Sequence, residues 1–161
     1  MTTEEVKFFS ILLGVGEYIE YKNFIDSILN NDCEIDDLIA DLLLAGENYS
    51  KCCDILSSFY KNKIVDDTIV VFSLIEYTKN KLKSGEWDKN RAIEMFVKFT
   101  QEANKFHEDK INEPWATMKL LGLILDKNNS IVYESDFDDF VNFGKLLTEN
   151  NDIQTKLKSL F

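Results

Sequence analysis

The sequence predicts an all-α protein, a single-domain bundle of about eight or nine helices over residues 1–161. Three observations carry this prediction. The chain has one proline and six glycines, fewer turn-forming residues than a β-rich chain normally carries. Apolar residues recur three and four positions apart along most of the chain, which is the period of an amphipathic helix. Finally, 161 residues with 45% hydrophobic content suffice for one domain with a buried core.

The first four expected helices cover residues 3–13, 17–30 and 35–45 and a segment that Asn48 or Ser50 can cap. Each carries apolar residues at helical spacing. In the second, third and fourth helices these are Tyr21, Phe24, Ile25, Ile28 and Leu29; Ile35, Leu38, Ile39, Leu42 and Leu43; and Cys52, Ile55, Leu56 and Phe59. Gly14 and Gly16 end the first segment and Gly46 ends the third, as expected at helix ends.

Further helices are expected downstream. Asp66 and Asp67 open a helix that Gly85 closes, and residues 88–107 follow. The seam of this second segment consists of Ala92, Phe96, Phe99, Ala103 and Phe106. Pro114 suits the first position of a largely apolar helix. A helix capped by Ser135 and a short one from Asp152 end the chain.

Negative charge is concentrated in the first third of the chain. The formal net charge is −11, and residues 1–50 hold eleven acidic residues and two lysines. Only one of the eighteen basic residues is an arginine, Arg91. A nucleic-acid binder needs clustered Lys and Arg to displace counterions from phosphates, so no nucleic-acid partner is expected. The charge favours a basic protein partner instead.

The cysteines and the N-terminus predict a cytoplasmic protein. Cys33, Cys52 and Cys53 are odd in number and form no CxxC pair, which fits free thiols in a reducing compartment. Cys52 lies on an apolar stripe, with Cys53 at its border. The first residues are acidic where a signal peptide would be basic, and no apolar run is long enough to span a membrane.

Residues 126–137, DKNNSIVYESDF, carry oxygen-bearing side chains at the spacing of a calcium loop. Position 6 of such a loop needs glycine for its sharp turn, and Ile131 stands there. Position 12 needs a bidentate glutamate, and Phe137 stands there. Both requirements fail, so we expect a polar loop followed by a capped helix.

The other catalytic and metal-binding patterns also fail. His107 is the only histidine, and an HExxH motif would need a second one where Ile111 stands. Neither GxGxxG nor GxxxxGK[ST] occurs. A single histidine does not complete a two-histidine metal site. We therefore expect no enzyme activity, no metal and no cofactor.

The remaining signal is a set of acidic residues for binding a partner. On the helix at 35–45, Asp36, Asp37 and Asp41 lie away from the apolar stripe. If this helix and the one at 17–30 are antiparallel neighbours, their acids merge into one surface; a second acidic surface follows residue 133. The expected binding residues are Glu17, Glu20, Asp26, Asp32, Glu34, Asp36, Asp37, Asp41, Glu134, Asp136, Asp138 and Asp139. An ordinary solvated face is the competing interpretation of each.

In size, charge, absence of motifs and its Asn-, Lys- and Ile-rich composition, the chain resembles immunity proteins of bacterial toxin systems, such as contact-dependent growth inhibition. This resemblance implies a cytoplasmic inhibitor of a cognate basic toxin, a nuclease, whose active site or substrate groove it covers. Acidic side chains would imitate nucleic-acid phosphates, and Tyr18 or Trp87 would serve as exposed aromatic anchors. The alternative is an acidic helical adaptor, regulatory or DNA-mimic protein without catalytic activity.

Overall fold

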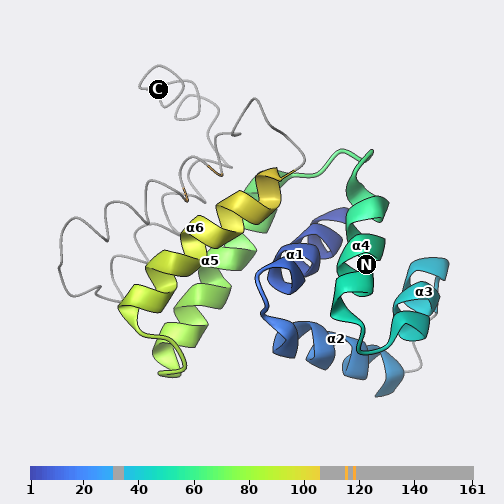
Figure 1. The fold of residues 1–161 in the computed structure, drawn as a ribbon, viewed down its shortest axis with the longest axis horizontal. Helices are drawn as coiled ribbons and strands as arrows, with labels where there is room; N and C mark the ends of the chain where they lie inside the picture. The colour runs from blue at the N-terminus through green and yellow to red at the C-terminus, as the bar shows by residue number, and fades with distance from the viewer. Residues whose placement is uncertain (31–34, 106–114, 116–117, 119–161) are drawn as a thin grey trace. The chain divides into compact units, whose positions relative to one another are not determined.

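The computed structural model describes residues 1–30, 35–105, Trp115 and Met118. All regular secondary structure in these residues is helical, which confirms the all-α prediction (Figure 1). Six helices have defined bounds: α1 Thr3–Gly14, α2 Tyr18–Asn30, α3 Asp37–Ala45, α4 Tyr49–Tyr60, α5 Asp67–Lys83 and α6 Lys89–Asn104. The helices expected after residue 118 lie outside the described residues.

Polar caps set the starts of three helices. The Thr2 hydroxyl accepts a hydrogen bond from the Glu5 backbone N–H, and the Glu5 carboxylate accepts one from the Thr2 backbone N–H. This capping box satisfies two donors that helix geometry leaves unpaired. The Asp36 carboxylate accepts from the Ile39 N–H at 2.8 Å. Asn48 caps α4, which confirms one of the two expected caps.

The described residues group into two compact units. The first contains α1 to α4 and the C-terminal turns of α6. Within it α1 packs on α2 and α4, and α4 packs on α3. Its fully buried apolar side chains include Val6, Ile11, Leu12, Leu42, Cys52, Leu56 and Phe99. The expectation of one single domain stays a prediction.

An aromatic cluster ties α1, α2 and α4 together. The Phe9 ring stacks on Phe24 with centroids 4.5 Å apart and meets Tyr21 edge-on. Tyr18, the first residue of α2, stacks on Tyr49, the first residue of α4, at 4.4 Å. Such ring pairs add to the stabilisation that comes from burial alone. The N-terminal ends of α2 and α4 are thereby fixed next to each other.

The second unit contains α5, the first turns of α6, and Trp115 and Met118, which are both buried and helical. Trp87 packs edge-on against Tyr77, with ring centroids 5.4 Å apart, and is 9% exposed. The prediction that Trp87 is an exposed anchor is therefore wrong. Gly85, at a φ of 75°, makes the turn that brings Trp87 back onto α5.

Two further expectations need correction. Ile35 was assigned to a buried stripe, but it precedes α3 and is 54% exposed. Leu29, expected on the apolar side of α2, is also exposed. Cys53, expected at the border of the apolar stripe, is 9% exposed and contacts Ser10 of α1. Among the described residues, no helix has both the length and the apolar character needed to cross a bilayer.

Candidate protein-binding groove

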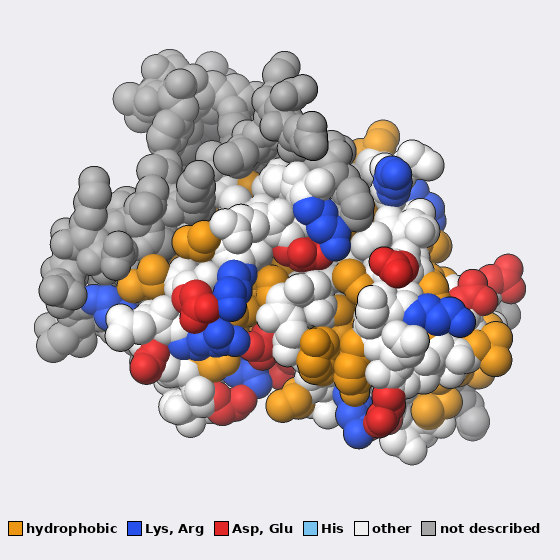
Figure 2. Space-filling model, viewed as in Figure 1, with side chains coloured by type: hydrophobic (Ala, Val, Ile, Leu, Met, Phe, Trp, Pro, Cys, Tyr) orange, Lys and Arg blue, Asp and Glu red, His pale blue; other side chains and the backbone are white. Residues whose placement is uncertain are grey.

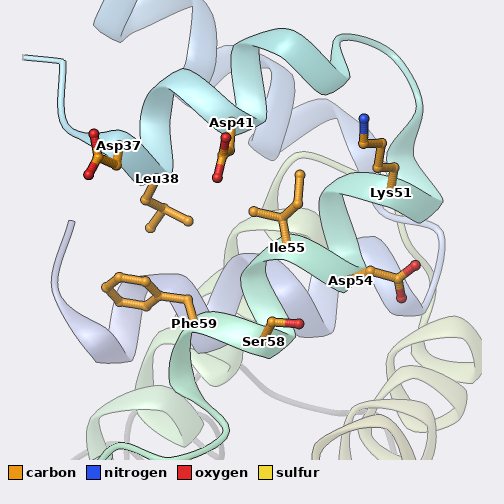
Figure 3. A pocket seen from close by; sticks show the side chains of 8 residues that line it. All are labelled: Asp37, Leu38, Asp41, Lys51, Asp54, Ile55, Ser58 and Phe59. Atoms are coloured by element: carbon orange, nitrogen blue, oxygen red, sulfur yellow. The ribbon is translucent and has the colours of Figure 1, made fainter.

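A groove of about 520 Å³ lies between α3 and α4 in the first unit (Figure 3). Apolar side chains lie between the two helices, and charged ones stand along both walls. The lining residues are Asp37, Leu38, Asp41, Lys51, Asp54, Ile55, Ser58 and Phe59. A three-residue connection from Gly46 to Asn48 joins the two helices, so the groove belongs to one local helical hairpin.

Burial of one face of α3 determines which side chains reach the groove. Leu38, Ile39 and Leu42 are buried on one side of α3, so the residues on the opposite side of the helix face outward. Asp37 and Asp41 are one turn apart on this outer side and are both exposed. The buried stripe that positions the two aspartates was expected from the sequence, apart from Ile35.

The α4 wall arises in the same way. Cys52, Leu56 and Tyr60 face the core, where the Cys52 thiol donates to the Gly46 carbonyl at 3.5 Å. Ile55 and Phe59 are half-buried, and they form the groove floor together with Leu38. The floor is therefore apolar and open to solvent along its length.

The carboxylates of Asp37, Asp41 and Asp54 make no hydrogen bond or ion pair within the part of the chain that the structure describes. The Lys51 ammonium, on the same groove, is also without such a partner there. Asp37 and Asp41 are spaced four residues apart on one helix, where like charges repel by about 0.2–0.5 kcal/mol. The groove thus concentrates uncompensated negative charge beside apolar surface.

Both ends of α4 carry a cation. Lys51 lies in the first turn of the helix, and Lys63 lies three residues after its last residue, Tyr60. The Lys63 ammonium lies 3.0 Å from the centroid of the Phe59 ring, within cation–π range. The negative charge of the groove is therefore strongest between these ends, along α3 and at Asp54.

The acidic residues that were expected to form one binding surface have different positions and roles in the structure. Asp36 is an N-cap, so its carboxylate is committed to α3 itself. Glu17 and Glu20 are half-buried and already engaged in other interactions, whereas Asp26 is exposed on α2. None of these lines the groove, which Asp37 and Asp41 share with Asp54 of α4. Asp32, Glu34, Glu134, Asp136, Asp138 and Asp139 lie outside the described residues.

One residue that lines the groove and one exposed residue near it were missed at the sequence level. Asp54 belongs to the site because α3 has α4 as its packing neighbour. Leu44 is 83% exposed and lies three residues after Asp41, on the same side of α3. Leu44 lies outside the expected apolar stripe, and a leucine at helical spacing from Asp37 and Asp41 was the signal that the sequence offered.

Tyr18, the other expected anchor, is 42% exposed. Its ring is stacked on Tyr49 and so holds α2 against α4, although its edge reaches solvent. Tyr18 therefore combines a structural contact with an accessible surface, but it lies outside the residues that line the groove.

A buried polar cluster lies between α1 and α4. The Ser10 and Ser57 hydroxyls are 2.9 Å apart, and the Cys53 thiol donates to the Ser10 carbonyl at 3.5 Å. Burial raises the pKa of the nearby Tyr60 hydroxyl. These groups satisfy one another inside the core, which is the arrangement expected of a structural network.

No group of three or more His, Cys, Asp or Glu side chains suited to a metal ion occurs among the described residues. Charge is also unevenly divided there. The described part of the first unit has twelve acidic and seven basic residues, a formal charge of −5, whereas residues 67–97 have five of each. Figure 2 shows acidic and basic side chains interspersed over the face it displays. The groove stands out because three carboxylates without a partner among the described residues line it together with apolar side chains.

Searches of family models, curated proteins and solved structures returned no match to this chain.

Proposed function

We propose that the protein is a non-catalytic cytoplasmic immunity protein that binds and neutralises a basic toxin through the α3–α4 groove. The observation that carries the proposal is a set of three carboxylates around an apolar floor, Asp37, Asp41 and Asp54, which have no partner among the residues that the structure describes. Carboxylates that have no partner among the described residues are available to a cationic group from outside. The proposal includes the single domain of eight or nine helices that the sequence predicts.

The groove suits recognition of a cationic protein surface in two ways. Complementary charge accelerates diffusional encounter by orders of magnitude and discriminates against wrong partners. Apolar contact at Ile55 and Phe59 then slows dissociation, because the contact between the proteins excludes water there. A toxin nuclease presents a cationic groove to its nucleic acid, and bound carboxylates would occupy that groove in place of phosphates.

Co-expression with neighbouring reading frames tests the proposal. A frame that encodes a toxin domain with a basic C-terminal region is expressed in a bacterial host, with or without this chain, and growth is followed. Wild-type protein is expected to restore growth. The variant Asp37→Lys/Asp41→Lys, which reverses the groove charge without touching a buried residue, is expected to restore it poorly.

The matched control is Asp26→Lys/Glu76→Lys, which makes the same change in net charge at exposed positions outside the groove. Circular dichroism establishes that all variants fold. Failure of the wild-type chain to protect against any neighbouring toxin, or equal protection by both variants, would remove the basis of the proposal.

The same groove favours a second candidate, an acidic helical adaptor or regulatory protein. Its apolar floor and the exposed Leu44 suit a bound peptide segment. A protein that only imitates the charge of DNA does not need such apolar surface. The two candidates differ in outcome: an immunity protein abolishes the activity of its purified partner, whereas an adaptor binds its partner and leaves that activity intact.

A further inference from the structure

We infer that the occupant of the α3–α4 groove is an amphipathic α-helix that carries lysine or arginine beside an apolar stripe. The inference rests on the proposed function, because it names the segment through which a basic partner is held. It follows from the floor, the walls and the length of the groove.

The floor requires an apolar group. Leu38 is buried at its base, while Ile55 and Phe59 are only half-covered by the described residues. Phe59 carries the Lys63 ammonium over its ring. An apolar side chain inserted between Ile55 and Phe59 would remove both from water, and a purely polar ligand would not.

The walls require cations at helical spacing. Asp37 and Asp41 stand one turn apart on α3, and Asp54 stands on α4 across the groove. Two carboxylates one turn apart match two basic side chains one turn apart on a helix that lies alongside. Lys51 and Lys63 repel cations at the two ends of the groove, so the basic side chains of the occupant are expected between them.

The dimensions and the exposed surface fit a helix. The nine residues of α3 span about 13 Å, which is two to three turns of a bound helix. Leu44, on the same side as the two aspartates, offers a further apolar contact at the end of that span. An amphipathic helix presents apolar residues three and four positions apart, with basic residues flanking them.

Charge opposes the other candidate occupants. A second copy of the chain would bring another net charge of −11 to an acidic groove, and a nucleic acid would bring phosphates. A basic helical segment is the occupant whose charge complements both walls.

The test uses the full chain and a fluorescent synthetic peptide of leucine and lysine, about four turns long. Its leucines occupy one helical face. One comparison peptide has the same composition in an order that forms no apolar face, and another has glutamate in place of lysine. Fluorescence anisotropy measures the dissociation constants with wild type, Asp37→Asn/Asp41→Asn and the charge-matched control Asp26→Asn/Glu76→Gln.

Wild type is expected to bind the amphipathic basic peptide at least about tenfold more tightly than either comparison peptide, a difference of 1.4 kcal/mol. The Asp37→Asn/Asp41→Asn variant is expected to lose about tenfold in affinity, and the control less than about twofold. Ile55→Ala should weaken the amphipathic peptide and leave the scrambled one unaffected.

Equal binding of the scrambled peptide would overturn the helix inference while leaving charge recognition intact. Absence of binding, or equal losses in the Asp37→Asn/Asp41→Asn variant and the control, would overturn it as well. So would a dimer in sedimentation experiments that the Asp37→Asn/Asp41→Asn variant abolishes. Growth protection without peptide binding counts against this inference alone, whereas peptide binding in the groove without protection counts against the proposed function.

Discussion

At the scale of single residues, many acidic side chains of the described chain have a partner there, whereas Asp37, Asp41 and Asp54 of the groove have none. Lys81 shows the contrast. Its ammonium is buried, and it donates to the exposed Glu86 carboxylate at 2.6 Å. This hydrogen bond, with one from Ser84, holds the pKa of Glu86 below its ordinary value of 4.5. Similar assignments exist for Asp36 and Asn48 as caps.

The lowered pKa of Glu86 predicts a pH dependence of stability. Because the folded protein favours the charged form, the contribution is complete above pH 4.5 and is lost as the pH falls through the lowered pKa. Denaturant midpoints of wild type and Glu86→Gln should therefore differ at neutral pH and converge in acid. A difference that persists or grows in acid would contradict this pairing.

The buried hydroxyl pair predicts strong coupling between Ser10 and Ser57. Replacing either serine by alanine leaves the other hydroxyl buried without that partner, at a cost of about 1–3 kcal/mol of unfolding free energy. The double variant removes both groups and should cost less than the sum of the single changes. Urea unfolding of the four proteins measures the cycle, and simple additivity would show that the two hydroxyls do not interact.

At the scale of elements, caps and buried stripes decide where the groove carboxylates stand. Asp36 and Asp37 are adjacent acids with different roles, since Asp36 caps α3 and Asp37 lines the groove. Asp36→Ala should lower the unfolding free energy by about 1 kcal/mol. Asp37→Ala should cost less, because it loses only a dipole interaction of about 0.3–1 kcal/mol. A reversed order in urea unfolding would contradict these roles.

Local patterns predicted these elements well. The stripe of Leu38, Ile39 and Leu42 gave α3 its buried side, and its outer aspartates followed from it. The prediction that Ile35 belongs to this stripe was wrong, because the helix begins only after the cap at Asp36. Trp87 was misplaced because its burial depends on a turn at Gly85 and a contact with Tyr77 that no local period encodes.

The site was only half predictable for a related reason. Asp37 and Asp41 lie opposite a readable stripe, whereas Asp54 and Ile55 join them through the packing of α3 on α4. Which helices pack together depends on the fit of their side-chain surfaces, and a single sequence does not show it. On the sequence alone, α2 is expected to pack beside α3 and to join its acidic residues to those of α3. In the structure the residues that line the groove come from α3 and α4.

At the scale of the whole molecule, the net charge of −11 attracts cationic proteins in general, and, under the proposed function, the groove determines where such a protein docks. Within the described residues the negative excess belongs to the first unit, which also contains the groove. Overall charge attracts any cationic protein weakly and is screened over about 8–10 Å at ordinary salt. Specific docking therefore depends on carboxylates that are close together, unpaired and next to apolar surface.

The most direct test of this account is the association rate with the basic toxin domain identified by growth protection, measured by stopped flow across a salt series. We predict that Asp37→Asn/Asp41→Asn associates at least about tenfold more slowly than wild type at low salt, with a flatter salt dependence. The control Asp26→Asn/Glu76→Gln, with the same net charge, should stay close to wild type. Equal rates for the two double variants at every salt concentration would contradict the claim that the α3–α4 groove receives the partner.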